Sequence, residues 1–176
     1  LEHLANTDIV TGMSNRAAFE KWARRTIAQA RASHDGLCLV LVDVDHFKRI
    51  NDRFGHAAGD DALARIGQAL RLINEEDDDK CARWGGDELI ALWRCCRSDV
   101  LAQRFEAFRD LVHGLYISDA SGTEMRGLTV SCGGVIIRPD DDQRLEDYLR
   151  LADDQLYAAK RGGRDAWRLG ALEHTG

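Results

Sequence analysis

The chain has 176 residues, of which 44% are hydrophobic and 31% charged, and its formal net charge is −6. This length suits one domain with a buried core, and no stretch approaches the roughly 18–20 continuous apolar residues that a membrane-spanning helix needs. The negative charge argues against non-specific binding to nucleic acid or an anionic membrane. It does not exclude a nucleotide, because a bound metal ion can bridge acidic residues to phosphates.

The cysteines and the first residues of the chain bear on its cellular compartment and on whether it is a fragment. An odd number of five cysteines without paired C-x-x-C spacing is typical of neither a zinc site nor a disulfide framework. Cys38, Cys81 and Cys132 lie among apolar residues, which predicts buried thiols in a reducing cytoplasm. The residues from Leu1 to Leu4 show neither a signal-peptide pattern nor an initiator methionine, so we expect a fragment of a longer protein.

The first half of the chain predicts a helix, a strand and two further helices. Ser14 or Asn15 can cap the first helix, whose apolar residues then recur at helical spacing. The unbroken apolar run Leu37–Val42 indicates a central strand that is covered on both faces. A short polar helix is expected near 46–53, and a longer helix is expected to start near Gly59.

The second half predicts a hairpin, a helix, a strand, a helix and a final strand, at about 81–93, 101–115, 128–137, 145–159 and 166–169. The acidic run 75–79 is expected to be a loop. No internal repeat or interior linker divides the chain. This order indicates one α/β domain with helices packed on an open sheet, and the hairpin indicates a mixed rather than an all-parallel sheet.

The first candidate for chemistry is Asp43-Val44-Asp45, at the end of the buried strand. Aspartate is unfavourable inside strands, but at a strand end its carboxylate can face the cleft where open α/β sheets bind ligands. Magnesium prefers hard oxygen ligands and usually takes one or two protein carboxylates together with phosphates. The alternative is that Asp43 or Asp45 only caps the following helix.

The second candidate is the segment Arg83–Leu89, with the sequence RWGGDEL. Two glycines at a hairpin turn let the backbone approach a ligand closely. Asp87 and Glu88 would point to opposite faces of an extended strand, so that one can bind a metal while the other handles a proton. The alternative is an acidic pair on a surface turn. Together, the two acidic segments predict a two-carboxylate magnesium site, where metals can clamp the attacking and leaving oxygens of a phosphoryl transfer.

Five segments of the chain, in order and in spacing, resemble the GGDEF family of diguanylate cyclase domains. They are DIVTGMSNR from Asp8, DVDHFKRIND from Asp43, Gly55-His56 with Gly59-Asp60, GGDEL from Gly85 and KRGGR from Lys160. The resemblance runs from about Asp8 to Arg168, and the common order of the segments makes it specific.

The resemblance implies a ferredoxin-like βαββαβ core of the nucleotidyl cyclase and polymerase-palm type. This is an α+β fold whose mixed, mostly antiparallel central sheet is flanked by helices and extended by an extra hairpin. The resemblance also implies a lead-in or linker at 1–7, the GGDEF domain at 8–170 and a tail at 171–176.

The reaction implied by the resemblance joins two GTP molecules into cyclic di-GMP on Mg²⁺ or Mn²⁺. Asp43 and Asp87 should bind the metal, with the Val44 carbonyl as a third ligand. The metal neutralises phosphate charge and lowers the pKa of the attacking 3′-hydroxyl. Glu88 matches the residue proposed to accept that proton. Because an ordinary glutamate titrates near about 4.3 and is a weak base, Asp87 or water is the alternative.

The phosphates and the guanine have their own implied contacts. Lys48, also assigned to catalysis, and the backbone of His46 and Phe47 should hold the β- and γ-phosphates at a helix N-terminus. Lys160 and Arg164 match the distal phosphate contacts, and the alternative is that they only complement a helix dipole. The complete set of implied GTP-binding residues is His46, Phe47, Lys48, Asn51, His56, Asp60, Gly85, Gly86, Lys160 and Arg164.

Asn51 and Asp60 match the pair that reads guanine, because a carboxylate can accept from N1–H and N2–H₂ while an amide both donates and accepts. Leu63, one turn after Asp60, is expected to belong to the core. His56 is expected to be structural and hydrogen-bonded beneath the site.

Two positions depart from the family pattern. Leu89 stands where phenylalanine is usual, and we expect it to face the core and to leave some activity, because the change trims volume without adding a polar group. Many members bind the product as an inhibitor through Arg-x-x-Asp, but here Glu76 replaces the arginine before Asp79. The surrounding acidic run would repel phosphate, so we expect no product inhibition through this site.

The leading hypothesis is therefore an active diguanylate cyclase in bacterial second-messenger signalling, whose catalysis needs a homodimer that presents two GTP molecules. We expect a cytoplasmic domain, also where the full-length protein is membrane-anchored, without nucleic-acid or membrane contact. A fused sensory domain and a phosphodiesterase domain are the expected neighbours. One alternative, for which Leu89 is the only hint, is a GTP-binding regulatory domain that has lost turnover. Another is a related cyclase that makes cyclic AMP or a mixed dinucleotide, against which Asn51 and Asp60 argue.

Overall fold

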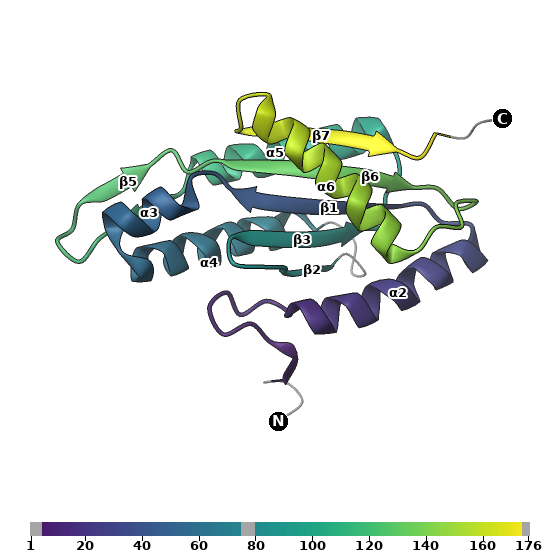
Figure 1. Cartoon of the computed structure of the whole chain (residues 1–176), viewed down its shortest axis with the longest axis horizontal. Helices are drawn as coiled ribbons and strands as arrows, with labels where there is room; N and C mark the ends of the chain where they lie inside the picture. The colour runs from purple at the N-terminus through teal and green to yellow at the C-terminus, as the bar shows by residue number, and fades with distance from the viewer. Residues whose placement is uncertain (1–4, 75–79, 174–176) are drawn as a thin grey trace.

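A computed structural model describes residues 5–74 and 80–173 of the chain (Figure 1). The helices are α2 (Arg16–Ser33), α3 (Phe47–Phe54), α4 (His56–Ile73), α5 (Ser98–His113) and α6 (Leu145–Arg161). The strands are β1 (Leu37–Val44), β2 (Lys80–Arg83), β3 (Glu88–Trp93), β4 (Tyr116–Ser118), β5 (Glu124–Arg126), β6 (Val130–Ile137) and β7 (Ala166–Ala171). The predicted order of elements is confirmed, with the small β4–β5 hairpin as an addition.

The main sheet has five strands in the order β2-β3-β1-β6-β7. Every neighbouring pair is antiparallel except β6 and β7, which are parallel, so the prediction of a mixed, mostly antiparallel sheet is confirmed. β1 lies in the middle, and all of its residues are buried. A strand covered on both faces needs apolar side chains on both, which is why its sequence shows no polar alternation.

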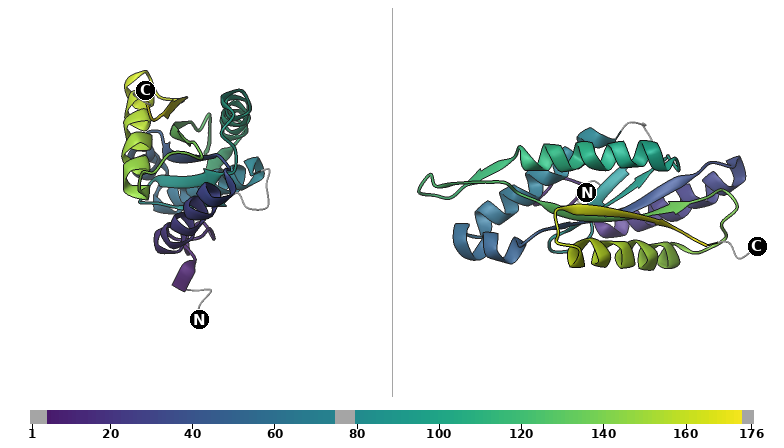
Figure 2. Two further views of the ribbon diagram at one scale, coloured as in Figure 1. Left: turned by 90° about the vertical axis from the view of Figure 1, so that its right-hand side faces the viewer. Right: turned by 90° about the horizontal axis from the view of Figure 1, so that it is seen from above.

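Helices cover both faces of this sheet (Figure 2). The even-numbered residues of β1, from Cys38 to Val44, belong to the core that also contains α4 and α5. The odd-numbered residues from Leu37 to Leu41 belong to the core that also contains α2 and α6. Because side chains alternate along a strand, Asp43 lies on the same face of the sheet as α6.

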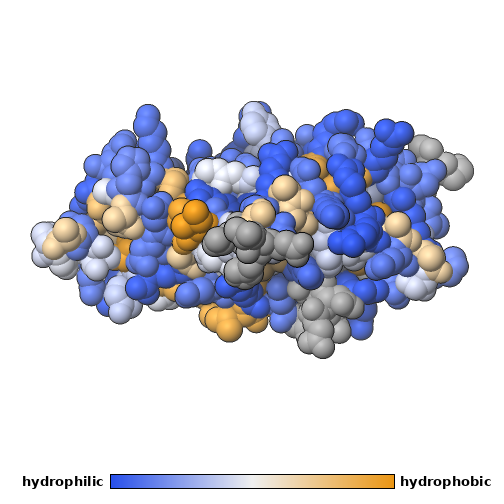
Figure 3. Space-filling view, turned by 90° about the horizontal axis from the view of Figure 1, so that it is seen from below, coloured by the Kyte–Doolittle hydropathy of each residue, from blue (hydrophilic) through white to orange (hydrophobic). Residues whose placement is uncertain are grey.

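The surface is mostly polar. The face seen in Figure 3 is mainly hydrophilic, and its hydrophobic side chains form separate small patches. No helix in the described part of the chain is both long enough and apolar enough to cross a bilayer.

Two predicted helix starts are refined. Asn15 rather than Ser14 caps α2, and its side chain accepts a hydrogen bond from the Ala18 amide at 3.0 Å. α4 starts at His56 rather than near Gly59. The single residue between α3 and α4 is a glycine with φ of 93°, and this conformation lets one helix follow the other directly.

The sequence-based expectations for the cysteines are confirmed, whereas one small hairpin was not foreseen. Cys38, Cys81 and Cys132 are buried, as predicted. The β4–β5 hairpin was not expected, because strands of three residues are too short to show a periodic pattern. The loop expected at 75–79 lies outside the described residues.

α6 packs on the sheet where β6 carries Gly133. A Cβ atom at this position would lie 2.2 Å from the Leu156 nitrogen and 2.3 Å from the Ala152 oxygen. Both atoms belong to the α6 backbone, which cannot yield as the end of a flexible side chain can. Glycine therefore permits the close approach of α6, and this approach positions Lys160 in the last turn of the helix.

We predict that Gly133→Ala lowers the free energy of unfolding by about 1–3 kcal/mol or more, because α6 must move away from the sheet. Urea unfolding followed by circular dichroism measures the loss. Gly114→Ala is the control, because a Cβ there would meet its nearest atom at an ordinary 3.5 Å. This control should change stability by less than about 0.5 kcal/mol. Equal, small losses in both variants would contradict the proposed close packing.

Candidate active site

The candidate site starts with three carboxylates where β1 ends and β3 begins. Asp43 is paired with Glu88 across the antiparallel ladder, so the two side chains lie on the same face of the sheet. Asp87 precedes Glu88 in the turn, where its carbonyl accepts a hydrogen bond from the Val44 amide at 3.1 Å. The structure thus brings the two acidic segments together. Because Asp87 lies in a turn, the alternation of an extended strand applies only from Glu88 onward.

Burial raises the pKa values of Asp43 and Glu88. Burial is the main reason why the pKa of Asp43 rises to about 6, with an opposing effect of Lys160 and a further increase from Asp87. Burial and then the charge of Asp87 also raise the pKa of Glu88. Carboxylates that repel one another in a half-buried place are stabilised in their charged form by a nearby cation.

Lys160 supplies a positive charge at Asp43. Its ammonium group forms an ion pair with Asp43 Oδ2. Burial lowers the pKa of Lys160, but the Asp43 carboxylate outweighs this effect, with help from Glu88 and Asp87, and the pKa rises. Each partner of the ion pair thus stabilises the charged form of the other.

The oxygen atoms of this cluster suit a hard divalent cation. Asp43 Oδ1 is buried and has no hydrogen-bond partner, so it is available as a ligand. In the described part of the chain, no three His, Cys, Asp or Glu side chains are grouped as a metal site. Asp43 and Asp87 are the residues that could hold such a cation, since Mg²⁺ usually takes one or two protein carboxylates when phosphates complete its shell.

Asp45 does not cap the following helix. The N-cap residue of α3 is His46, and no side chain caps this helix. Asp45 is buried, and its carboxylate accepts hydrogen bonds from the Thr129 and Ser131 hydroxyls at 2.7 Å each and from the Asp165 amide at 2.9 Å. Asp45 therefore ties the end of β1 to β6 and to the turn that follows α6.

The turn after α6 carries Arg164 and is also held by α5. Arg164 and Asp165 have φ angles of 63° and 46°, which are uncommon for residues other than glycine. The Arg109 guanidinium donates two hydrogen bonds of 3.0 Å to the Asp165 carboxylate, and His113 Nε2 lies 2.7 Å from the same group. Sequence analysis missed Arg109 and His113, because only the apolar residues of α5 show helical spacing.

Arg83 and Asp8 hold the Gly-Gly turn in place. The Arg83 guanidinium donates to the carbonyls of Gly85 at 3.1 Å and Gly86 at 2.8 Å and pairs with Asp8 at 3.2 Å. Burial tends to raise the pKa of Asp8, but hydrogen bonds from Thr11 and the charge of Arg83 lower it below its ordinary value. The entry segment of the chain is thus a brace for the acidic turn, a role that sequence analysis did not assign to either residue.

α3 begins directly after the acidic strand end. His46 has a left-handed backbone with φ of 56°, and the side chains of His46 and Lys48 are exposed while Phe47 is half-buried. The first amides of α3 receive no side-chain cap, so they are free to donate to an anion.

Asn51 lies where α3 meets α4. Its Oδ1 is buried and has no hydrogen-bond partner, and a Cβ at Gly59 would lie 1.8 Å from this atom. Gly59 therefore makes room for the Asn51 amide. Asp60 follows Gly59 with an exposed side chain. Leu63 is fully buried in the core, as expected.

His56 and Leu89 are the remaining described residues for which the sequence predicted a position. The side chain of His56 is exposed at the start of α4, so the expectation that it is held beneath the site is wrong. The reason is that α4 begins at this residue and not further along the chain. Leu89 is fully buried with α4 and α5, as predicted, on the face of the sheet opposite to Glu88. The feedback positions Glu76 and Asp79 lie outside the described residues.

Comparison with known proteins gives matches over nearly the whole chain. The family model described as "Diguanylate cyclase, GGDEF domain" matches residues 5–166. Diguanylate cyclase DgcP of Pseudomonas aeruginosa is 37% identical over 164 residues, which cover 92% of this chain and 23% of DgcP. Diguanylate cyclase DosC of Escherichia coli is 32% identical over 163 residues, which cover 93% of this chain and 35% of DosC. The chain thus spans less than half the length of these relatives.

Solved structures match as well. The GGDEF domain of DgcB from Caulobacter crescentus, in complex with c-di-GMP, has a TM-score of 0.85 and 30% identity, and the match covers 97% of this chain and 94% of that domain. Diguanylate cyclase SiaD of P. aeruginosa, in complex with its activator SiaC, has a TM-score of 0.86 and 29% identity, with 97% and 63% coverage. These neighbours have the palm-type cyclase fold, which confirms the predicted fold class.

We predict that Arg83→Met lowers the free energy of unfolding by about 1–3 kcal/mol, because the variant loses hydrogen bonds from a charged donor to two carbonyls and to Asp8. Arg83→Lys should recover only part of this loss, since an ammonium group lacks the planar fork that reaches all three acceptors. Urea unfolding measures both values. Arg97→Met, which breaks an exposed ion pair with Asp99, is the control and should cost less than about 0.5 kcal/mol. A loss at Arg83 no larger than the loss at Arg97 would contradict the brace.

Proposed function

Because this chain belongs to the GGDEF family of diguanylate cyclase domains, we propose that it joins two GTP molecules into cyclic di-GMP and releases two pyrophosphates. The observation that carries the proposal is the convergence of Asp43, Asp87, Glu88 and Lys160 from β1, the β2–β3 turn, β3 and α6. A cluster that combines repelling carboxylates with a lysine suits a substrate that brings both phosphates and a divalent cation.

Asp43 and Asp87 are the residues that would hold the cation, Mg²⁺ or Mn²⁺, with the Val44 carbonyl as the third protein ligand. The bound cation would neutralise phosphate charge and lower the pKa of the attacking 3′-hydroxyl. The unpartnered Oδ1 of buried Asp43 supports this assignment. Lys160 pairs with Asp43 in the structure, and once a cation neutralises Asp43 its ammonium group can turn to a GTP phosphate.

Glu88 is the proposed proton acceptor. Its raised pKa makes it a stronger base than an ordinary exposed glutamate, although Asp87 and water remain alternatives. Leu89 packs on the other face of the sheet, so the change from the usual phenylalanine does not contact these carboxylates.

The phosphate and base contacts follow from α3, α4 and the turn after α6. The uncapped first amides of α3, Lys48 and Arg164 are the proposed phosphate donors. The hydrogen bonds of Asp45 and Asp165 fix the turn that presents Arg164. Asn51 and Asp60 are the proposed guanine contacts, and the unpartnered Asn51 Oδ1 supports a donor on the ligand.

The assembly is part of the same proposal. Each domain presents one GTP, so catalysis takes place in a homodimer. The curated relatives are larger proteins, which supports neighbouring domains such as a sensory module or a phosphodiesterase. We place the catalytic domain at 8–170, between a lead-in at 1–7 and a tail at 171–176, in the cytoplasm.

The cyclase proposal predicts that wild-type protein at high concentration converts GTP and Mg²⁺ into cyclic di-GMP, measured by chromatography. Asp87→Ala should lower the rate at least about 100-fold, because several kcal/mol of charge stabilisation in the transition state are lost. Asp110→Asn removes an exposed carboxylate from α5 and should leave the rate unchanged. An enforced dimer that binds GTP without forming product would instead favour the regulatory alternative.

A separate prediction concerns the metal alone. Without nucleotide, Mg²⁺ at ten times its Kd should raise the free energy of unfolding by about 1.4 kcal/mol, which corresponds to a Tm increase of about 3–6 °C. The same titration on Asp43→Asn and Asp87→Asn should give little or no increase, whereas Asp110→Asn should behave as the wild type. Equal increases in all four proteins would show that the metal stabilises the domain elsewhere.

A further inference from the structure

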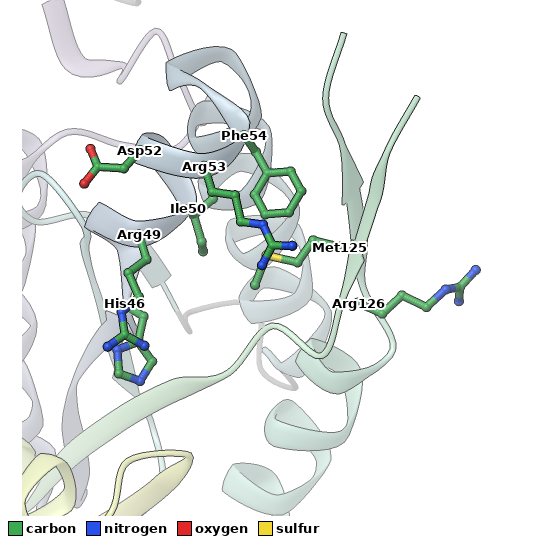
Figure 4. A pocket seen from close by; sticks show the side chains of 8 residues that line it. All are labelled: His46, Arg49, Ile50, Asp52, Arg53, Phe54, Met125 and Arg126. Carbon is green, nitrogen blue, oxygen red and sulfur yellow. The ribbon is translucent and has the colours of Figure 1, made fainter. Parts of the chain in front are cut away.

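A cavity lies between α3 and β5, and none of its lining residues belongs to the carboxylate cluster (Figure 4). Its volume is about 610 Å³, within the range of about 300–1,000 Å³ that is typical of small-molecule sites. We call it the α3–β5 pocket. The side chains of Ile50, Phe54 and Met125 supply its apolar surface.

The pocket uses a different face of α3 from the candidate GTP site. His46, Arg49, Ile50, Arg53 and Phe54 recur at the spacing of a single helical face. The proposed GTP contacts of α3 belong to the remaining positions of the helix. The two sites therefore use mostly different positions of one short helix, and His46, an implied phosphate contact through its backbone, also lines the pocket.

The rim of the pocket is cationic although the whole chain carries a charge of −6. Within residues 5–74 and 80–173, neither Arg49 nor Arg53 forms an ion pair with a carboxylate. The Arg53 guanidinium lies over the Phe54 ring at 5.4 Å from its centroid. Arg126 also lines the pocket and pairs with Glu124, and Asp52 is the one carboxylate among the lining residues. The lining therefore combines three guanidinium groups with one carboxylate, and two of these guanidinium groups, those of Arg49 and Arg53, have no carboxylate partner among the described residues.

This combination defines the chemistry of a ligand. A guanidinium group binds a carboxylate, sulfonate or phosphate through paired hydrogen bonds, and it also stacks on flat rings. The surfaces of Ile50, Phe54 and Met125 favour an apolar body, and the volume admits one or two fused rings. In Figure 4 the Arg53 side chain extends toward Phe54 and Met125, whereas the Arg49 side chain extends toward His46. We propose that the α3–β5 pocket binds a small aromatic anion, with its ring against Phe54 and Met125, its charged group at Arg53 and the positive charge of Arg49 at the rim.

A consequence for regulation rests on the proposed function. α3 also carries Phe47, Lys48 and Asn51, so an occupant of the pocket contacts the helix that would hold GTP. Occupancy should therefore change the affinity for GTP by about twofold or more. An unchanged affinity would overturn this coupling, whereas the binding site itself is judged without GTP.

Methionine methyl NMR tests the site directly, because the chain has only two methionines. Met125 lines the pocket, and Met13 is buried in the core with 1% exposure, so it serves as an internal reference. Protein labelled with ¹³C at the methionine methyl groups is titrated with 2-naphthoate. The Met125 signal should shift to saturation while the Met13 signal stays in place. The uncharged isostere 2-naphthamide should bind at least about tenfold more weakly, because it lacks the charge-assisted hydrogen bonds.

Variants of the two arginines then test whether their positive charges contribute to ligand binding. Arg49→Gln and Arg53→Gln should each weaken 2-naphthoate binding several-fold, and an unchanged Met13 signal would show that each variant is folded. Arg150→Gln removes the same charge from exposed α6 and should bind as the wild type. The proposal is overturned if Met125 does not respond, if Met13 shifts with it, if the acid and the amide bind equally, or if Arg150→Gln has the same effect as the pocket variants.

Discussion

The central constraint in this structure is the burial of β1. This strand is hydrogen-bonded on both edges and covered by helices on both faces, so its interior tolerates only apolar side chains. Carboxylates can occur only where the strand ends, and there they are still largely desolvated. The ladder places Asp43 opposite Glu88, and the turn before Glu88 adds Asp87. The acidic cluster is thus a direct result of strand register.

Desolvation gives this cluster its chemical character. Burial and mutual repulsion raise the pKa values of Asp43 and Glu88, and Lys160 offsets part of that effect at Asp43. A buried oxygen atom without a partner is unfavourable in the free protein and favourable as a metal ligand. The same feature that costs stability therefore prepares the site for a cation and for the phosphates of GTP.

Polar contacts from segments far apart in the chain hold the turns around the site in place. Asp8 and Arg83 brace the Gly-Gly turn, and Asp45 anchors the turn after α6 together with Arg109. Gly133 lets α6 approach the sheet closely enough for Lys160 to reach Asp43. These contacts explain how loops and helix ends, which are usually the mobile parts of a domain, can present ligands in a defined arrangement.

The sequence by itself determined the order of the main elements, the central buried strand, the mixed sheet and the two acidic segments. These features depend on local spacing and on residues that are close in the chain, such as Leu37–Val42 or the RWGGDEL turn. Only the tertiary structure decided which carboxylate joins the cluster, since Asp45, two residues after Asp43, is bonded to β6 and the Asp165 amide instead. Tertiary structure also placed His56 on the surface, added the β4–β5 hairpin and opened the α3–β5 pocket. The physical reason is that these outcomes depend on contacts between residues far apart in the chain, which no local pattern encodes.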